Sequence, residues 1–405
     1  MQKDYVTKFY VEEGIEASLY AMGSELQFIS LLSENNSALQ NHIPSTLASG
    51  ILYLDDGCQK IVPWDGKGVP AVINGPTLVP EEFKGFDFSF GAQNKLQFDL
   101  RKAESLSNES TVFVEYGNIF PFTISKRCPG TMFAQVRDSL SSDEKLNVAS
   151  FLGEKLKALH LLPCPSFGDE VLSTESEMKL PLELLQSNLP AEWKIFIGIV
   201  YVKRKNIQKR LKKWQDSVPV ALIEKIDVYL PRDVMELFAA SEDESASDPT
   251  LLKYISWIHT DIMDDNVHLS RTSCSTQNEQ IRDNSPSGYL NGNAAASWHP
   301  CHLLDFSDIS IGDRILDLIP VHLDIFRGDP QLLERFLQSY NLPLLQSTKN
   351  RFARLSYHAM CYCILHDDNV LEAIFSIWKE LEDASSWEEV ERTVWGVLDD
   401  YHPPS

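Results

Sequence analysis

The chain has 405 residues and a formal net charge of −22 at pH 7, from 58 acidic and 36 basic side chains. This length accommodates one large two-lobed domain or two ordinary ones, and the hydrophobic fraction of 43% is typical of a globular protein. The negative charge argues against general nucleic-acid binding, which needs a cationic face to displace counterions. It does not exclude a nucleotide, because one lysine and a bound metal can meet its phosphates.

Hydropathy and cysteine content bear on the compartment. The best apolar run, residues 195–202, has eight residues, whereas a bilayer span needs about 20. Residues 1–5 contain no apolar signal core, so we expect no membrane association. Seven cysteines, an odd number without framework spacing, indicate reduced thiols and predict a cytoplasmic or nuclear protein.

The first elements predicted are a strand at residues 6–10 and, after a turn at 12–14, a helix. Apolar positions of this helix recur every three or four residues: Leu19, Met22, Leu26 and Ile29. Glu25 lies on or beside that apolar stripe, where an unpaired carboxylate would be costly. Lys8 on the preceding strand is the natural cation, so we expect a Lys8–Glu25 ion pair. The alternative is that both side chains are solvated at the helix edge.

The next segments predict a sheet, an insertion and a hinge. Residues 44–54 read as a strand, and residues 60–110, rich in Gly, Pro, Asn and Ser, read as an insertion to which we assign no chemistry. An apolar strand then breaks at a Pro-Gly pair, which fits a hinge at residues 123–130. There the exposed backbone, including Ile124 and Lys126, would contact the adenine of a nucleotide; an exposed linker is the alternative.

Further along, Ser141 and Glu144 form a predicted capping box that opens a helix. This helix ends near His160, for which we expect a structural role. Residues 241–248 are predicted to be an acidic flexible loop, and residues 270–297 a disordered insertion. The ends of the second insertion can still be neighbours, because the cost of closing a loop grows slowly with its length.

A motif of the form H-x-D-x-x-x-x-N begins at His259, and Asp305 later follows directly after an apolar strand. Phosphoryl transfer needs a carboxylate that accepts or orients the proton of the attacking hydroxyl, and an Asn and a second Asp that hold magnesium. We assign Asp261 to the first role, with His259 in the same catalytic motif, and Asn266 and Asp305 to the metal. Magnesium prefers hard oxygen ligands and takes few of them from protein. The alternative is a loop turn followed by an aspartate that caps a helix.

Three further segments extend the motif: Asp305-Phe306-Ser307-Asp308, Gly312-Asp313 and Asp317-Leu318. With them the chain resembles the aminoglycoside phosphotransferase/choline kinase-like branch of the protein-kinase-like fold. The resemblance implies an α+β, two-lobed architecture with a truncated N-lobe at 1–122, containing a small mixed sheet and one helix. The hinge at 123–130 would lead to a mostly helical C-lobe at 131–405.

The resemblance also implies a function. Lys8, held by Glu25, would contact the phosphates of ATP, and a Mg²⁺ ion would accompany the nucleotide during transfer of the γ-phosphate to a hydroxyl of a small molecule. Asp313 and Asp317 would anchor the catalytic loop by accepting backbone N–H bonds.

One part of that fold is not found before Lys8. Kinase-like folds place a hairpin there that covers the phosphates, and only seven residues precede Lys8. Two strands of about 5 residues and a turn need more. The hairpin is therefore either absent or upstream in a longer protein. This favours the alternative function, a catalytically weak kinase-like binding or scaffold module.

The amino-acid sequence of residues 259–266 and the insertion after them resemble the C-terminal region of plant F-box proteins that also carry a Jumonji-C domain. Neither domain lies in this sequence, so adaptor or demethylase activity is not carried over, and an F-box-type complex is expected only within a longer chain. A third hypothesis is an iron(II) dioxygenase, because His259, Asp261 and the distant His302 have the residue types of a two-His-one-carboxylate triad.

Overall fold

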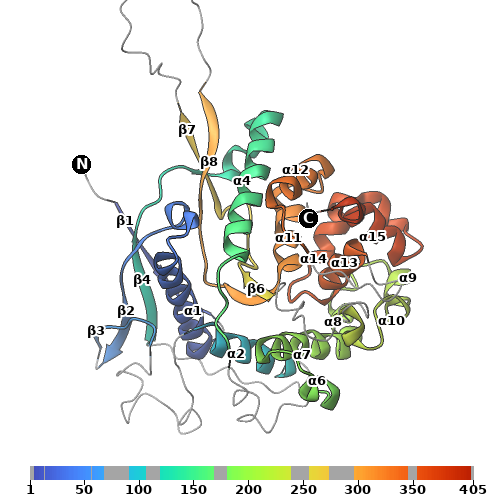
Figure 1. Ribbon diagram of the computed structural model, residues 1–405, viewed down its shortest axis with the longest axis horizontal. Coiled ribbons are helices and arrows are strands. Elements are labelled where there is room, and N and C mark those ends of the chain that lie inside the picture. Colours follow the sequence, from blue (N-terminus) through green and yellow to red (C-terminus); the bar gives the residue numbers. More distant parts are fainter. Residues whose placement is uncertain are drawn as a thin grey trace, which may run out of the picture.

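The computed structural model places a strand-rich part, which contains the N-terminus, beside a larger helical part (Figure 1). It describes residues 4–12, 14–55, 57–67, 91–105, 119–167, 180–238, 255–272, 296–344 and 354–402. Among the helices in these ranges, none is long and apolar enough to cross a bilayer. The predicted loop at 241–248 lies outside the described residues.

A four-stranded sheet forms the N-lobe, in the order β1-β4-β2-β3. Its strands are β1 (Tyr5–Phe9), β2 (Thr46–Asp55), β3 (Cys58–Pro63) and β4 (Ile119–Lys126). Every neighbouring pair is antiparallel, so the predicted mixed sheet is wrong. A helix joins β1 to β2 and lets both run in the same direction, but β4 inserts between them and runs against both.

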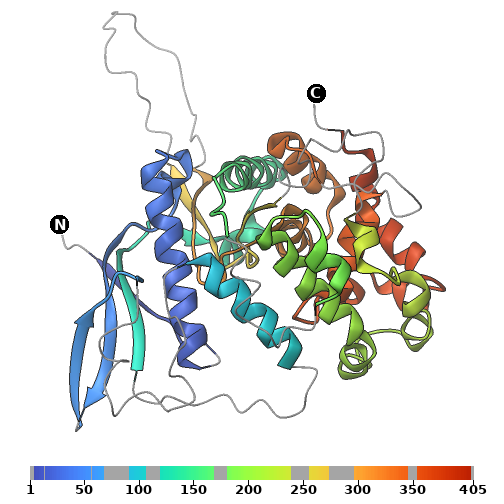
Figure 2. The same ribbon diagram turned by 60° about the horizontal axis from the view of Figure 1, so that its bottom comes forward.

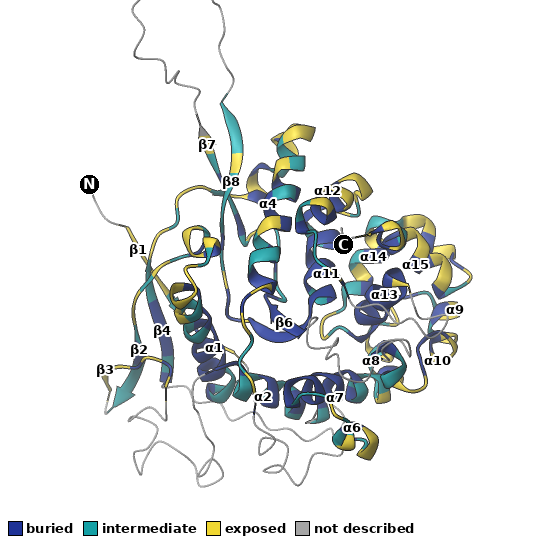
Figure 3. Ribbon diagram, viewed as in Figure 1, coloured by how far each residue is buried: buried dark blue, intermediate teal, exposed yellow. Residues whose placement is uncertain are grey.

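Helix α1 (Ile15–Glu34) connects the two lobes through its buried side chains. Leu19 and Met22 belong to the small core under the sheet, whereas Phe28 and Leu32 belong to the core of the C-lobe. The helix is correspondingly dark over most of its length in Figure 3, which colours residues by burial. Glu25 therefore lies between the two cores on a rigid element.

The structure contains a second helix in this region, α2 (Ala92–Ser105). The assignment of residues 60–110 to an insertion is therefore wrong, and so is the prediction that the N-lobe contains one helix. The apolar positions Ala92, Leu96 and Leu100 of α2 recur every four residues and are at most 2% exposed. This period is hard to see in the sequence, because charged residues lie between the apolar positions and a glycine-rich segment precedes them. The helix crosses from α1 to the C-lobe helix α7 (Figure 2).

The hinge begins later than predicted. Strand β4 continues to Lys126, and Ile124 pairs with Thr7 on one side and Ala48 on the other. Ile124 and Lys126 therefore belong to the sheet, and the N-lobe extends beyond residue 122. Strand β4 stays paired with β1 up to Lys126. The Pro-Gly pair comes later and lies at the end of the connection between the lobes.

The C-lobe is mostly helical, with two small sheets. One sheet has the order β5-β7-β8, and β6 pairs with β9. Strands β7 and β8 pair from Val267↔Leu303 to Thr272↔Ser297, so both ends of the predicted 270–297 insertion are strand and lie side by side. The capping box at the start of α4 is present as predicted.

The remaining elements of the C-lobe and the connection before β2 have the following bounds. They are η1 (Ala38–His42), β5 (Thr131–Met132), α3 (Phe133–Val136), η3 (Arg137–Ser139), α4 (Ser142–His160), α6 (Leu182–Gln186), α7 (Ala191–Lys205), α8 (Ile207–Lys213), α9 (Val220–Ile223), α10 (Ile226–Tyr229), η4 (Val234–Leu237), β6 (Ile255–Ile258), β7 (Val267–Thr272), β8 (Ser297–Leu303), β9 (Ser310–Asp313), η6 (Arg314–Asp317), α11 (Leu318–Pro320), η7 (Val321–Ile325), α12 (Pro330–Tyr340), α13 (Leu355–Leu365), α14 (Val370–Ile377), η8 (Lys379–Asp383), α15 (Trp387–Trp395) and η9 (Gly396–Asp400). A small antiparallel sheet with α1 and a mostly helical second lobe confirm the predicted α+β, two-lobed, kinase-like fold.

Candidate active site

Two consecutive elements and one segment far away in sequence meet at the side chain of Lys8. Its Nζ lies 2.6 Å from Glu25 Oε2 and 2.7 Å from Asp305 Oδ1. Strand β1 supplies the lysine, α1 supplies Glu25, and the segment after β8 supplies Asp305. The predicted Lys8–Glu25 ion pair is confirmed, and the structure adds Asp305 to it.

Lys8 and Asp305 favour each other's charged forms. Burial opposes the charge of Lys8, but Glu25 and Asp305 outweigh it and raise the pKa of the ammonium. Burial also opposes ionisation of Asp305, yet the charge of Lys8 and hydrogen bonds from Lys8 and Ser307 lower its pKa to about 2. Ser307 donates its hydroxyl to Asp305 Oδ1 at 2.7 Å. Lys8 and Asp305 are therefore ionised at neutral pH.

Tyr10 completes this cluster and was not predicted from the sequence. Its hydroxyl donates to Glu25 Oε2 at 2.8 Å, the oxygen that also accepts from Lys8, and its ring centroid lies 4.8 Å from Lys8 Nζ. The side chain is 2% exposed. Tyr10 follows Lys8 by two residues, so both point to the same face of the strand, and this alternation was the available signal.

The loop between β6 and β7 carries His259, Asp261 and Asn266. His259 is 1% exposed, and its two ring nitrogens are both engaged. Nε2 donates to the Leu304 carbonyl at 3.1 Å, and Nδ1 accepts the Asp261 backbone N–H at 3.3 Å. The imidazole thus ties the loop to the segment that precedes Asp305.

These contacts contradict the iron(II) dioxygenase hypothesis. A metal at His259 would need a ring nitrogen that the loop already uses. Within the ranges that the structure describes, no group of three His, Cys, Asp or Glu side chains is placed to hold a metal ion.

Asp317 anchors the loop as predicted. Its carboxylate accepts the backbone N–H groups of His259 at 3.0 Å and Thr260 at 2.7 Å. Thr260 adopts a φ of 67°, an uncommon backbone conformation that these bonds stabilise. On its other side Asp317 contacts His160 Nε2 at 2.9 Å, and His160 Nδ1 contacts the Tyr340 hydroxyl at 2.6 Å. This buried chain gives His160 the structural role expected for it.

Asp313, in contrast, does not contact the loop, so that half of the prediction is wrong. It accepts the backbone N–H of Ile315 at 3.0 Å and the hydroxyl of Tyr362 at 2.8 Å. The carboxyl group caps the short helix η6, four residues before Asp317 reaches the loop. Burial raises the pKa of Asp313 to about 6, against the hydrogen bonds that favour its charge.

Asp261 and Asn266 face each other across the loop. The Asn266 amide donates from Nδ2 to the Asp261 backbone oxygen at 2.9 Å and to Oδ2 of its carboxylate at 3.3 Å. Burial raises the pKa of Asp261, His259 opposes this shift, and the carboxylates of Asp308 and Asp305 add to it. The Asn266 backbone oxygen accepts the Leu304 N–H at 2.9 Å, which places Asn266 beside the segment leading to Asp305.

A cavity of about 540 Å³ reaches Asp261 and Thr260. Residues of α2, α7, α13 and α14 form much of its wall. Lys8, Glu25, Asn266 and Asp305 do not line it. Of the residues predicted to have catalytic, phosphate-binding or metal-binding roles, Asp261 is the one that lines the cavity.

No known family model matches the chain. Over 413 residues it is 40% identical to Lysine-specific demethylase JMJ21 of Arabidopsis thaliana, and the match covers 98% of this chain and 42% of that protein. The chain thus spans less than half the length of this curated relative. The demethylase activity in that name belongs to the relative and is not assigned to this chain.

Solved structures with some likeness are phosphotransferases. The GDP and kanamycin complex of APH(2")-IIia is 14% identical with a TM-score of 0.43, covering 94% of this chain and 88% of that one. The macrolide 2'-phosphotransferase MphH from Brachybacterium faecium is 11% identical with a TM-score of 0.28, covering 94% of this chain and 99% of that one. At these identities and TM-scores nothing about substrate or activity carries over. Over nearly its whole length, the chain is related to part of a plant Jumonji-type protein, as the sequence of residues 259–266 predicted.

Proposed function

We propose that this chain is a Mg²⁺- and ATP-dependent phosphotransferase that moves the γ-phosphate to a hydroxyl of a small molecule. The observation that carries the proposal is Lys8 bridging Glu25 and Asp305. In kinase-like enzymes the Lys–Glu pair and the metal-binding Asp must both be in place before transfer occurs. Here β1 and α1 supply the pair, and a segment 297 residues after Lys8 supplies the Asp.

The residues present fit a magnesium ion that arrives with a nucleotide. Such an ion takes one or two protein oxygens, because phosphates and water supply the rest of its octahedral shell. Asp305 offers Oδ2, since the bonds from Lys8 and Ser307 reach Oδ1. Asn266 offers its amide oxygen, since its nitrogen faces Asp261. When bound, magnesium would neutralise charge on the phosphates.

Lys8 is proposed to contact the phosphates directly. An ammonium group has three N–H donors, and Glu25 and Asp305 take two of them. The third remains for a phosphate oxygen. Glu25, itself fixed by the Tyr10 hydroxyl, restricts where that donor points.

Asp261 is proposed to act as the base. The acceptor oxygen forms a bond to the γ-phosphorus, the bond from that phosphorus to the leaving ADP oxygen breaks, and the hydroxyl proton passes to the Asp261 carboxylate. Burial raises the pKa of this carboxyl group, which makes it a better proton acceptor. The Asn266 amide, hydrogen-bonded to Oδ2, orients the carboxylate.

The test is transfer of labelled γ-phosphate from ATP, to water or to a panel of alcohols, with Asp261→Asn as the variant. Loss of a base lowers the rate by about 10²–10⁴-fold, and ATP affinity should stay nearly unchanged. Asp265→Asn, an exposed carboxylate of the same loop, is the matched control and should retain the wild-type rate. Wild-type transfer by Asp261→Asn would contradict the proposal.

A second candidate is a weak or inactive kinase-like module that binds a nucleotide within a larger protein. It rests on β1, which is an edge strand: in the described part of the chain no strand pairs with its outer side, and Tyr5, Val6 and Phe9 are exposed. Nothing among the described residues therefore covers the phosphates from that side. Binding of Mg²⁺ and ATP without transfer to any alcohol of the panel would favour this candidate.

A longer protein would also give the module its partners. The chain corresponds to 42% of its plant relative, so an F-box-type complex remains part of this second candidate. The described cysteines are free thiols, which supports a cytoplasmic or nuclear location.

A further inference from the structure

The cavity beside Asp261 has the size of a small-molecule site. Its volume of about 540 Å³ falls within the range of about 300–1,000 Å³ of such sites. Thr260 and Asp261 line it together with helices from both sides of the catalytic loop. A compound bound there could present a hydroxyl to Asp261.

We infer that this cavity holds the acceptor, and that the acceptor is an alcohol with an apolar body rather than a polycation. The inference rests on the proposed phosphotransferase function and adds the substrate class to it.

Apolar side chains dominate the lining. They come from α2, α7, the loop after His259, β6, β9, the η6–η7 region, α13 and α14: Leu96, Ala103, Phe196, Ile199, Val200, Ile258, Met263, Ile311, Leu316, Ile319, Pro320, Leu323, Tyr362, Leu365, Val370 and Ala373. Transfer of an apolar group from water to such a lining contributes about 0.8 kcal/mol per buried methylene. An apolar body therefore gains affinity here that a highly hydrated sugar does not.

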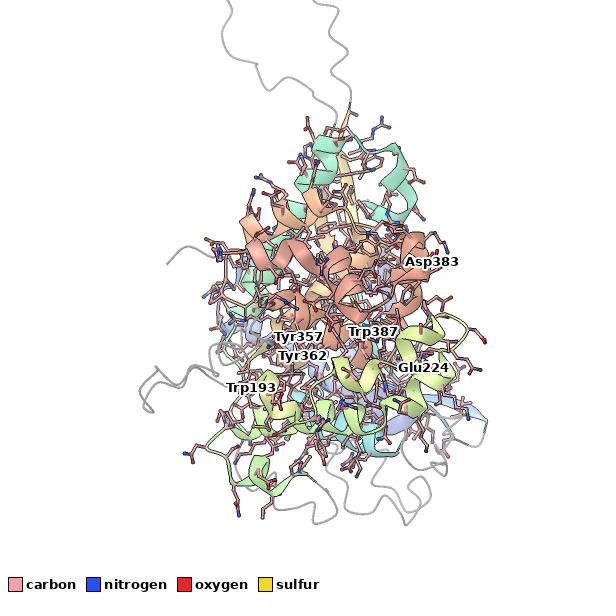
Figure 4. The ribbon with its side chains drawn as sticks, turned by 90° about the vertical axis from the view of Figure 1, so that its right-hand side faces the viewer. Trp193, Glu224, Tyr357, Tyr362, Asp383 and Trp387 are labelled. Atoms are coloured by element: carbon pink, nitrogen blue, oxygen red, sulfur yellow. The ribbon has the colours of Figure 1, made fainter. Side chains whose placement is uncertain are left out.

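The walls are held in place by buried contacts. Tyr362 of α13 lies within the helical part (Figure 4), is 3% exposed, and donates its hydroxyl to Asp313 at 2.8 Å. Its ring thereby lines the cavity without offering its polar group. Val370 and Ala373 of α14 are half-buried, so they face accessible space.

Charges around the cavity largely neutralise one another. Apart from Asp261, the lining contains five carboxylates and four cationic side chains: Asp99, Asp308, Asp324, Asp367 and Asp368, with Lys95, Lys102, Lys203 and Arg327. Lys95 pairs with Asp99 at 3.1 Å, and Lys203 pairs with Asp367 at 2.7 Å. Arg327 pairs with Asp324 at 3.3 Å. A polycation would compete with these cations for Asp99, Asp324 and Asp367, which are already paired.

Helix α2 contributes charged side chains to this wall. It lies in the segment between β3 and β4 and contributes Lys95, Asp99 and Lys102 to the cavity. Burial lowers the pKa of Lys95, but the charges of Asp99 and Asp308 outweigh it and raise the pKa. The lysine thus remains charged and satisfied by the protein rather than by a ligand.

Two probes of different chemistry test the inference in direct binding measurements on the full chain. 2-Naphthyl β-D-glucopyranoside is a neutral alcohol with an apolar body, and kanamycin is a hydrophilic polycation. We expect the glucoside to bind the wild-type chain at least about tenfold more tightly than kanamycin, a factor that corresponds to 1.4 kcal/mol.

Val370→Trp and Ala373→Phe fill the cavity from α14, and each should weaken glucoside binding by at least about tenfold. Val220→Trp, on the exposed surface of α9 at 65% exposure, is the matched control and should leave it unchanged. Circular dichroism of each variant checks folding, and having two filling variants keeps the test decisive if one does not fold.

Equal or tighter binding of kanamycin overturns the inference, as does binding of neither probe. Glucoside binding that survives both filling variants overturns it too. Stabilisation by Mg²⁺ and ATP is measured on the same proteins. If it is missing from the wild type while the glucoside binds, the phosphotransferase function fails and the cavity preference stands, so the two failures are distinguishable.

Discussion

Replacing Asp317 should destabilise the catalytic loop more than any exposed aspartate of the chain. The carboxylate is fully buried, with 0% side-chain exposure, and it accepts two backbone N–H groups and contacts one imidazole nitrogen. Asp317→Ala leaves the amides of His259 and Thr260 without this acceptor. It also leaves Thr260 at a φ of 67° without the bonds that stabilise it.

The magnitude follows from the number and type of bonds lost. A hydrogen bond to a charged group contributes about 1.5–3 kcal/mol, so three lost bonds give a gross cost of about 4.5–9 kcal/mol. Removing a buried carboxylate also removes its desolvation penalty, which lowers the net cost to about 3–5 kcal/mol. Asp317→Asn keeps one acceptor oxygen and should cost about 1.5–3 kcal/mol.

Urea unfolding measures the free energy, and amide hydrogen exchange of His259 and Thr260 localises it. Asp329→Ala is the matched control: Asp329 also accepts two backbone N–H groups, those of Gln331 and Leu332, but it is exposed at the start of α12. Loss of that cap should cost about 1 kcal/mol.

Both Asp317 variants should speed exchange at the loop amides, and Asp329→Ala should not. A cost for Asp317→Ala no larger than that for Asp329→Ala would refute the assignment of Asp317 as the anchor of the loop. Unchanged exchange at His259 and Thr260 would refute it as well.

Three further outcomes are expected. Tyr10→Phe keeps the ring beside Lys8 but loses the bond to Glu25, so ATP affinity should fall by about three- to tenfold, the equivalent of one hydrogen bond, in calorimetric titrations. Burial raises the pKa of Asp313 to about 6, so its stabilising contribution is present below pH 4 and lost as the pH rises through 6; relative to wild type, Asp313→Asn should gain up to about 3 kcal/mol between pH 4 and 7 in urea unfolding. Gly153→Ala places a Cβ 2.5 Å from the Phe336 carbonyl oxygen, where α4 meets α12, and should cost about 1–3 kcal/mol of unfolding free energy.

The parts of the fold that sequence could predict are those in which one local pattern decides the outcome. The capping box of α4 needs only two residues, Ser141 and Glu144, and the structure contains it. The Lys8–Glu25 pair followed from the cost of an unpaired carboxylate on an apolar stripe. Helix α2 was missed because its four-residue apolar period is short and lies in a glycine- and serine-rich stretch.

The parts that sequence could not predict depend on which segments become neighbours. Only the insertion of β4 between β1 and β2 makes the sheet antiparallel and draws Ile124 into it. Tyr10 joins the Lys8 cluster because α1 brings Glu25 within reach of its hydroxyl. Asp313 and Asp317 were indistinguishable as a motif, and only the turn at η6 sends one to Tyr362 and the other to the loop. Which residues line the cavity likewise depends on tertiary packing.

Asp305 and Lys8 are proposed to form a site for a nucleotide with its magnesium ion. The most direct test of this site is the thermal stabilisation of the chain by ATP with and without Mg²⁺, in the wild type and in Asp305→Asn. A ligand at a hundredfold excess over its Kd stabilises by about 2.7 kcal/mol. We predict a magnesium-dependent increase in the wild type that disappears in Asp305→Asn, because a neutral amide lacks the charge that holds the ion. An equal stabilisation of both proteins, or none in the wild type, would contradict the account.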